Sequence, residues 1–162
     1  MKRIDKRALL EALRTGLAEE IATMTRIARE AAQAATHEEN KPEGDKDMRS
    51  TEASYIARGQ AERVLELERA HQVLSSLELK VFDSSTPIES SALIELRQGE
   101  KSALYFLVGA GGGRRVAIDG VEIGTLTAVT PLGKALLGAT EGDEIEIESP
   151  QGVRSFEIVS VT

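Results

Sequence analysis

Apolar residues recur every three or four positions along two long stretches of the chain. In the first stretch, from residue 5 to about 37, the recurring positions are Leu9, Leu10, Leu13, Leu17, Ile21, Met24, Ile27, Ala28, Ala31 and Ala35. The second stretch starts near Met48 or Ser50, and its stripe consists of Ala53, Ile56, Ala57, Gln60, Val64, Leu67, Ala70, Val73, Leu74 and Leu77. This spacing predicts two amphipathic helices. Because only a short segment joins them, we predict an antiparallel helical hairpin.

The segment between the two helices, residues 38–47, is polar and contains Pro42 and Gly44. Both residues favour a loop over a continuing helix. Each helix of about 30 residues would be roughly 45 Å long at 1.5 Å per residue. The loop would therefore lie at the far end of a long, thin hairpin. That geometry favours a probe that reaches a distant site over a compact helical core.

After residue 81 the pattern changes to short segments of strand type. Asp83-Ser-Ser-Thr-Pro ends the helical region, and the predicted strands are 92–96, 102–108, 115–118, 122–129, 144–148 and 154–161. Turns are predicted at residues 97–100 and at Asp119-Gly120. A short helix over 132–137 begins after Pro131, whose missing N–H falls where no helical bond is needed, and stops at Gly138. Strands with one short helix predict an α+β domain.

Composition narrows the function classes. The chain has 162 residues, of which 41% are hydrophobic and 29% charged, with no Cys and no Trp. The absence of Cys excludes a disulfide scaffold and a thiolate metal site. No apolar run approaches the roughly 20 residues that span a bilayer, so we expect a cytoplasmic protein with no membrane partner. The net charge of −7 argues against broad binding of nucleic acid through its phosphates.

The charge is unevenly distributed along the sequence. The first seven residues carry four cations and one anion, whereas residues 38–52 carry six anions and three cations. The basic residues near the N-terminus are either ordinary solvated charges or a surface that faces RNA or a protein partner; they are Lys2, Arg3, Lys6, Arg7 and Arg14. The acids of the loop can equally be a solvated turn, because helix N-termini favour anions.

One stretch near the C-terminus carries a family resemblance. Its pattern is Thr130-Pro-Leu-Gly-Lys-Ala-Leu-Leu-Gly, then Glu141-Gly-Asp-Glu-Ile-Glu-Ile-Glu-Ser-Pro-Gln-Gly152. This pattern resembles the C-terminal domain of the Gre transcript-cleavage factors of bacterial RNA polymerase. Glu52-Ala-Ser-Tyr-Ile-Ala-Arg is similar to the family's segment just after the tip of its coiled coil. The resemblance implies an N-terminal antiparallel coiled coil over 1–80 with an acidic tip at 38–50, and an FKBP-like α+β domain over 81–162.

The resemblance also implies a partner and an activity. Gre factors are accessory proteins, not enzymes; the coiled coil enters the secondary channel of the polymerase, and the other domain docks at the channel rim. Tip carboxylates then help to hold Mg²⁺ near backtracked nascent RNA, so the ion is shared with the polymerase and no cofactor of the chain's own is expected. Mg²⁺ prefers hard oxygen ligands, and a second metal ion can activate water. The implied site residues are Asp45 and Asp47 as metal ligands, with Glu52 and Glu43 behind them.

Two alternatives remain open for the function. The family's tip spaces its acids as D-x-x-E, a spacing absent from residues 38–55. The chain is therefore either a cleavage factor with displaced acids or a channel-binding regulator that inhibits without cleavage. A module that uses residues 5–80 for coiled-coil interactions unrelated to transcription is the other alternative, although we expect a monomer. Prolyl isomerisation is not expected, because such a site needs an aromatic-rich pocket and residues such as Tyr105, Phe106 and Phe156 supply little aromatic surface; a fold alone does not confer the activity.

Gly109-Ala-Gly-Gly-Gly113 is the remaining motif. It lacks the Lys and Ser or Thr of a phosphate loop and a βαβ context. We predict that it forms a flexible hairpin connection.

Overall fold

The computed structural model describes residues 4–39 and 46–162 and divides the chain into two compact units. One unit is Thr15–His71. The other combines the N-terminal residues through Arg14 with Gln72–Thr162. The division into functional domains at residue 80 stays a prediction.

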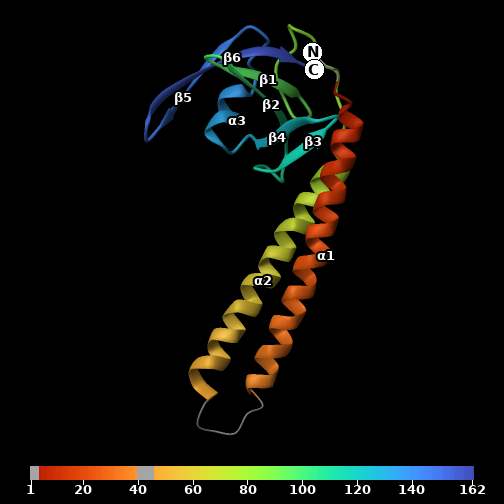
Figure 1. The fold of residues 1–162 in the computed structure, drawn as a ribbon, viewed down its shortest axis with the longest axis vertical. Coiled ribbons are helices and arrows are strands. Elements are labelled where there is room, and N and C mark those ends of the chain that lie inside the picture. The colour runs from red at the N-terminus through yellow and green to blue at the C-terminus, as the bar shows by residue number, and fades with distance from the viewer. Residues whose placement is uncertain (1–3, 40–45) are drawn as a thin grey trace. The chain divides into compact units, whose positions relative to one another are not determined.

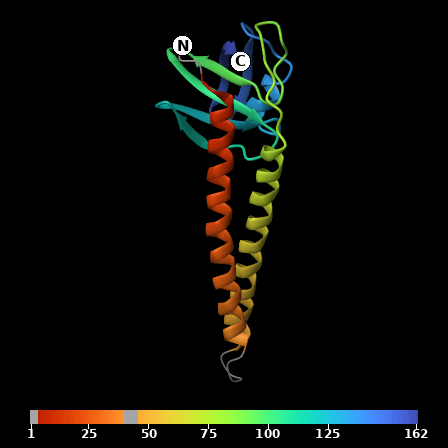
Figure 2. The ribbon, with the colours of Figure 1, turned by 90° about the vertical axis from the view of Figure 1, so that its right-hand side faces the viewer.

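Two long helices account for the N-terminal half of the chain. Helix α1 is Lys6–Glu39 and helix α2 is Lys46–Ser75, and the two run side by side in both views (Figure 1, Figure 2). The prediction of two long helices is confirmed. The expected loop was too long, because residues 38–39 and 46–47 are helical. Neither helix, nor any other in the described part of the chain, is long and apolar enough to cross a membrane.

The apolar seam of the hairpin unit is thin. Where burial is described, its buried apolar residues are Leu17, Ala35, Leu67 and Ala70. Arg63 reaches across from α2 to Glu20 of α1 at 3.4 Å. Ile56 was predicted to lie in this seam, but it is 51% exposed. The error arose because a stripe of three- and four-residue steps is wider than the part of α2 that α1 covers.

The second unit contains a mixed sheet of six strands in the order β3-β4-β2-β1-β6-β5. The strands are β1 Leu93–Gln98, β2 Lys101–Val108, β3 Arg115–Ile118, β4 Val121–Thr127, β5 Glu144–Ser149 and β6 Gly152–Val161. All six segments predicted as strands are confirmed. β2 and β4 pair in parallel, with Phe106 opposite Thr125, whereas the other neighbouring strands are antiparallel.

One face of the sheet forms the core with helix α3, Pro131–Leu136 (Figure 1). Buried side chains of this core include Ile94, Leu96, Leu107, Leu136, Ile145, Phe156 and Ile158. Along β5 and β6 these residues alternate with exposed ones, which is the pattern of strands covered on one face only. The fold class is therefore a long helical hairpin with a C-terminal α+β unit, as predicted.

Helix α3 begins at a close-fitting corner. The Thr130 hydroxyl accepts a hydrogen bond from the Gly133 N–H at 3.1 Å and donates to the Thr127 carbonyl at 2.9 Å. A Cβ on Gly133 would lie 2.0 Å from that same carbonyl oxygen. A glycine is therefore required at this position for α3 to approach the end of β4.

The glycine-rich segment 109–113 connects β2 to β3, but these strands are not neighbours, because β4 lies between them. The prediction of a hairpin connection is therefore wrong. The Thr125 hydroxyl, which is buried, donates to the Gly111 carbonyl at 2.8 Å, and the Gly113 N–H donates to the Thr125 carbonyl at 2.8 Å. The glycines allow the chain to cross over β4 with its backbone in contact with that strand.

Candidate functional site

Two of the four acidic residues predicted for the tip belong to helix α2. Glu43 and Asp45 lie outside the described residues. Asp47 belongs to the first turn of α2, and Glu52 is an exposed residue of the same helix. The assignment of Asp45 and Asp47 as Mg²⁺ ligands stays a prediction.

No group of three or more His, Asp or Glu side chains in residues 4–39 and 46–162 is arranged to hold a metal ion. The prediction of a metal site therefore rests on the tip residues alone, and no cluster among the described side chains supports it.

Two adjacent side chains of α2, close in sequence to the tip, face solvent. Tyr55 is 69% exposed and Ile56 is 51% exposed. The two are consecutive residues of the helix, and consecutive helical side chains do not face each other. The sequence pattern had assigned Ile56 to the seam.

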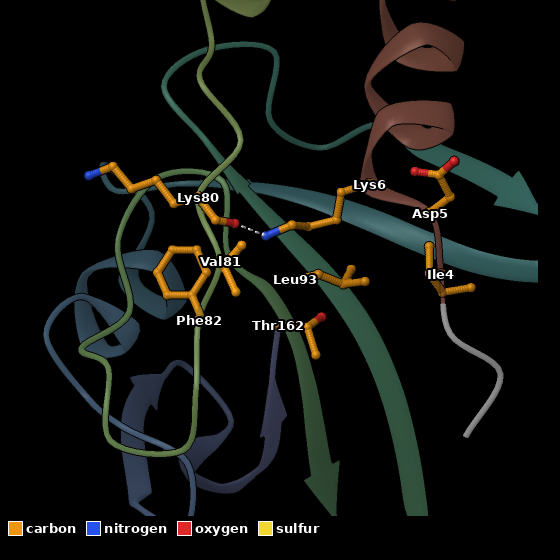
Figure 3. Close-up of a pocket in the computed structure, with 8 residues that line it drawn as sticks. All are labelled: Ile4, Asp5, Lys6, Lys80, Val81, Phe82, Leu93 and Thr162. Atoms are coloured by element: carbon orange, nitrogen blue, oxygen red, sulfur yellow. Dashed lines mark hydrogen bonds between the residues drawn. The ribbon is translucent and has the colours of Figure 1, made fainter.

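A cavity of about 640 Å³ lies in the sheet unit, beside the start of α1. Its lining residues are Ile4, Asp5, Lys6, Lys80, Val81, Phe82, Leu93 and Thr162 (Figure 3). Half of these side chains are apolar. Lys6 extends from α1 across the cavity toward the backbone of Lys80, as the close-up shows.

The ammonium group of Lys6 donates two hydrogen bonds to backbone carbonyls. One goes to the Lys80 oxygen at 2.6 Å and the other to the Ser91 oxygen at 2.9 Å. The same nitrogen lies 4.9 Å from the centre of the Phe82 ring. Burial beside these groups removes water from the charged form and lowers the pKa of Lys6 to about 8.

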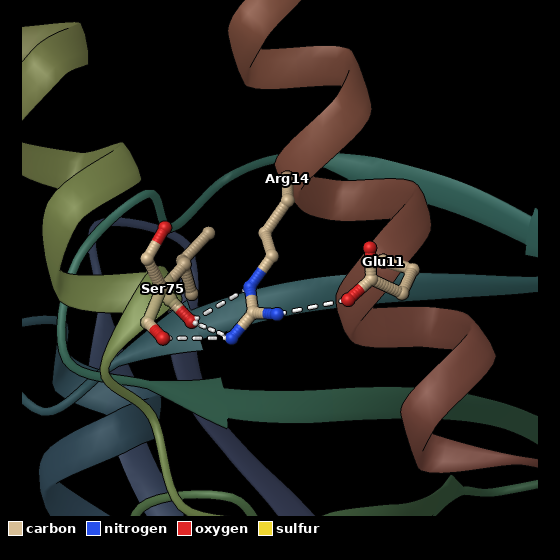
Figure 4. Close-up of polar contacts among 4 residues, drawn as sticks. Glu11, Arg14 and Ser75 are labelled. Atoms are coloured by element: carbon tan, nitrogen blue, oxygen red, sulfur yellow. Dashed lines mark hydrogen bonds and ion pairs between the residues drawn. The ribbon is translucent and has the colours of Figure 1, made fainter.

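Arg14 makes a second set of contacts between α1 and the end of α2 (Figure 4). Its Nε and Nη2 atoms donate to the Leu74 carbonyl at 3.2 and 3.1 Å, and Nη2 also donates to the Ser75 carbonyl at 2.8 Å. Nη1 pairs with Glu11 at 2.8 Å. The last carbonyls of a helix have no partner within the helix, so Arg14 supplies a cationic cap for α2.

These contacts correct one sequence interpretation. Lys6 and Arg14 were grouped with residues that are either solvated or turned toward RNA or a protein partner. Both are instead engaged by backbone carbonyls of the same unit. The basic residues near the N-terminus gave no sequence signal of these hydrogen bonds, because the acceptor carbonyls lie 60 or more positions away along the chain.

A family model described as "Transcription elongation factor, GreA/GreB, C-term" matches residues 119–162. The transcription elongation factor GreA of Cereibacter sphaeroides (strain ATCC 17029 / ATH 2.4.9) is 28% identical over 163 aligned positions, which cover 98% of both chains. GreA of Syntrophobacter fumaroxidans is 49% identical over 41 residues, 25% of this chain and 26% of that one. The crystal structure of GreA factor homolog 1 (Gfh1) of Thermus thermophilus aligns with 93% of this chain and 95% of its own, at 20% identity and a TM-score of 0.38.

A helical hairpin joined to a six-stranded mixed sheet defines a two-unit protein with a C-terminal α+β fold. The chain is similar to the Gre family in residues 119–162 by the family model, and along 98% of its length by the alignment with GreA. The resemblance seen in residues 130–152 is thereby confirmed. The FKBP-like description of the sheet unit stays a prediction.

Proposed function

We propose that this protein is a transcription elongation factor that binds bacterial RNA polymerase in the cytoplasm. The observation that carries the proposal is the alignment with GreA over 98% of both chains, because it spans the hairpin and the sheet unit together. The two helices of 34 and 30 residues supply the reach that a channel-inserted hairpin needs. At 1.5 Å per residue they are roughly 50 and 45 Å long.

In the specific form of the proposal, the hairpin enters the secondary channel and the tip stimulates endonucleolytic cleavage of backtracked RNA. Asp45 and Asp47 would contribute oxygen ligands to a Mg²⁺ ion shared with the polymerase active centre. The bound ion would act as a Lewis acid and would activate a water molecule. The tip needs to add only one or two carboxylates, because the polymerase holds the remaining ligands.

A cleavage assay tests this form directly. Backtracked elongation complexes with labelled RNA are incubated with Mg²⁺ and the protein, and shortened RNA is quantified. The double variant Asp45→Ala/Asp47→Ala is expected to lose cleavage stimulation while its affinity for core polymerase is unchanged. The matched control is Glu62→Ala/Glu68→Ala, which removes two exposed α2 carboxylates away from the tip. Full stimulation by the tip variant would refute the assignment.

A second function is favoured by the tip sequence itself. Residues 38–55 lack the D-x-x-E spacing of the family, and residues 46–47 already belong to α2. A hairpin that occupies the channel without positioning metal ligands would inhibit the polymerase or exclude other channel-binding factors. In the same assay this outcome appears as slowed extension, or as blocked action of a cleavage-competent factor, without shortened RNA.

We expect the contact with the channel rim to lie on the sheet unit and to include exposed apolar residues near α3. Val129, just before α3, is 79% exposed, and Leu137, just after it, is 45% exposed. We expect Val129→Glu to weaken binding to core polymerase, because a new charge would have to be desolvated at an apolar contact. Val153→Glu, at another exposed valine of the same unit, is the control and should leave the affinity unchanged. If Val129→Glu binds core polymerase with the affinity of the unmodified protein, Val129 is not part of the contact.

Absence of co-purification with core polymerase would contradict both functions. It would leave the coiled-coil interaction module as the remaining interpretation of residues 5–80.

A further inference from the structure

The cavity beside α1 contains an amine in an unusual setting. Four of its eight lining side chains are apolar, namely Ile4, Val81, Phe82 and Leu93, and they come from three separate segments of the sheet unit. Lys6 and Lys80 are the two lysines that line it. The side chain of Lys80 is paired with Glu89 at 2.8 Å, whereas that of Lys6 bonds only to backbone carbonyls among the described residues. Among the described residues, Lys6 is therefore the lysine of this cavity that pairs with no carboxylate side chain.

The hydrogen-bond geometry suits a neutral amine as well as an ammonium group. A primary amine has two N–H donors and one lone pair. The carbonyls of Lys80 and Ser91 accept two donors from the Lys6 nitrogen. When the third proton leaves, both hydrogen bonds can remain, and the freed position becomes the lone pair. The two carbonyls thus hold the nitrogen in place without using the electrons that make it nucleophilic.

The surroundings favour loss of that third proton. The partly buried position lowers the pKa of Lys6 to about 8, through desolvation of the charged form. Of the residues that line the cavity, Asp5 and Lys80 carry the other charged side chains, and Glu89 reaches Lys80 rather than Lys6. A lysine desolvated in an apolar pocket is one of the recognised forms of an activated nitrogen nucleophile.

We propose that Lys6 is a modification site, at which the ε-amine accepts an acyl group from a small activated acyl donor that enters this cavity. The amine attacks the carbonyl carbon of an acyl phosphate or an acyl thioester. A C–N bond forms, and the C–O bond to phosphate or the C–S bond to the thiolate breaks. The leaving group takes the electron pair, and the amine proton passes to water. The apolar walls contact the hydrocarbon part of the acyl group.

Acylation would change the contacts of α1 with the rest of the unit. The product amide has a single N–H, so it can no longer donate to both the Lys80 and the Ser91 carbonyls. It also removes the positive charge that lies over the Phe82 ring. Acylation at this position would therefore loosen the start of α1 from the segment that follows α2.

The test compares acylation rates of individual lysines in the full-length protein. Acetyl phosphate is the donor in one arm and an acetyl thioester in the other, and peptide mass spectrometry quantifies each site at pH 7.5. With a pKa of about 8, Lys6 has over 100-fold more free amine at this pH than a lysine with the usual pKa near 10.4. A less basic amine is also a weaker nucleophile, and this removes about half of the gain in the logarithm of the rate. We expect Lys6 to react about tenfold faster than the exposed residues Lys101 and Lys134.

Two further readouts separate the cavity from general reactivity. The rate at Lys6 should level off above about pH 8, where the amine is already neutral. Val81 lines the cavity and is 92% exposed, so Val81→Glu adds a carboxylate there without disturbing the core. It should stabilise the ammonium form and slow Lys6 several-fold, whereas the control Val153→Glu should not.

A rate at Lys6 equal to or below that of Lys101 and Lys134 in both arms would overturn the proposal. A fast reaction that Val81→Glu leaves unchanged would also overturn it, because the cavity would then not be the cause. Reaction with one donor only would retain the site and identify its source of acyl groups.

Discussion

Substitution of Gly133 by alanine tests how α3 is held against the sheet. The added Cβ would lie 2.0 Å from the Thr127 carbonyl oxygen and 2.8 Å from its carbon. Distances below 3.0 Å are essentially never seen for Cβ atoms, so either α3 or the end of β4 must move by about 1 Å. Backbone atoms cannot rotate away as a flexible side chain can. The displacement would pull on Leu136, which is fully buried in the core.

The expected cost follows from three contributions. Overpacking of this kind costs about 1–3 kcal/mol. Disturbance of the Thr130 cap, which bonds both Gly133 N–H and Thr127 O, adds about 1 kcal/mol. The better helix propensity of alanine returns about 1 kcal/mol. The net destabilisation of the sheet unit is therefore about 2 kcal/mol.

Urea unfolding can follow the sheet unit alone. The chain has no Trp and two Tyr, of which Tyr55 is exposed on α2 and Tyr105 packs against the core of the sheet unit. In a Tyr55→Phe background, Tyr105 fluorescence reports the sheet unit. A loss of about 2 kcal/mol should lower the urea midpoint by roughly 1 M.

The matched control is Gly59→Ala in the same background. Gly59 lies in α2, and nothing lies within 4 Å of the Cβ it would gain. This change should leave the Tyr105 midpoint unchanged and stabilise the hairpin helix by about 0.5–1 kcal/mol, measured by circular dichroism. An unchanged or raised Tyr105 midpoint for Gly133→Ala would show that the corner is less constrained than the geometry requires.

Three further predictions concern charge. Asp45→Ala/Asp47→Ala should reduce cleavage stimulation by roughly tenfold or more if these residues ligate Mg²⁺, since metal-bound water is the nucleophile; the elongation-complex assay measures it against Glu62→Ala/Glu68→Ala. Arg14→Met should destabilise the protein by about 2 kcal/mol in thermal or urea unfolding, because the Leu74 and Ser75 carbonyls lose a charged donor; Arg26→Met, which loses one exposed pair with Glu30, should change it by less than about 0.5 kcal/mol. The folded-state pKa of Lys6, about 8, is below its unfolded value, so the unfolded chain binds more protons between about pH 8 and 10. The free energy of unfolding should therefore rise with pH over this range. Lys6→Met should remove this part of the slope, and an identical slope in the variant would contradict the prediction.

Local sequence signals were sufficient for most elements of the fold. Asp119 and Gly120 both adopt positive φ, as a tight two-residue turn between β3 and β4 requires, and that turn was predicted from the residue pair alone. Gly138, with φ of 79°, ends α3 where the sequence placed its end. These features depend on neighbours within a few positions.

The features that were missed depend on distant partners. The parallel pairing of β2 with β4 requires the glycine segment to cross over a strand, and no local pattern specifies which strand that is. Lys6 and Arg14 have acceptors far along the chain, so their sequence neighbourhood showed only a basic run. The acids of the tip were identified by composition and resemblance, and their chemistry depends on a partner.

The composition of the two units has a consequence for the order in which the protein folds. Residues 15–71 are contiguous, so the hairpin unit can form as soon as α2 has left the ribosome. The sheet unit instead combines residues up to Arg14 with Gln72–Thr162, and β6, near the end of the chain, lies between β1 and β5. The residues up to Arg14 are synthesised first, but their unit cannot be completed until β6 has been synthesised. A fragment that begins at residue 81 would lack the first turns of α1, Arg14 included, and should be less stable than the same strands in the intact chain.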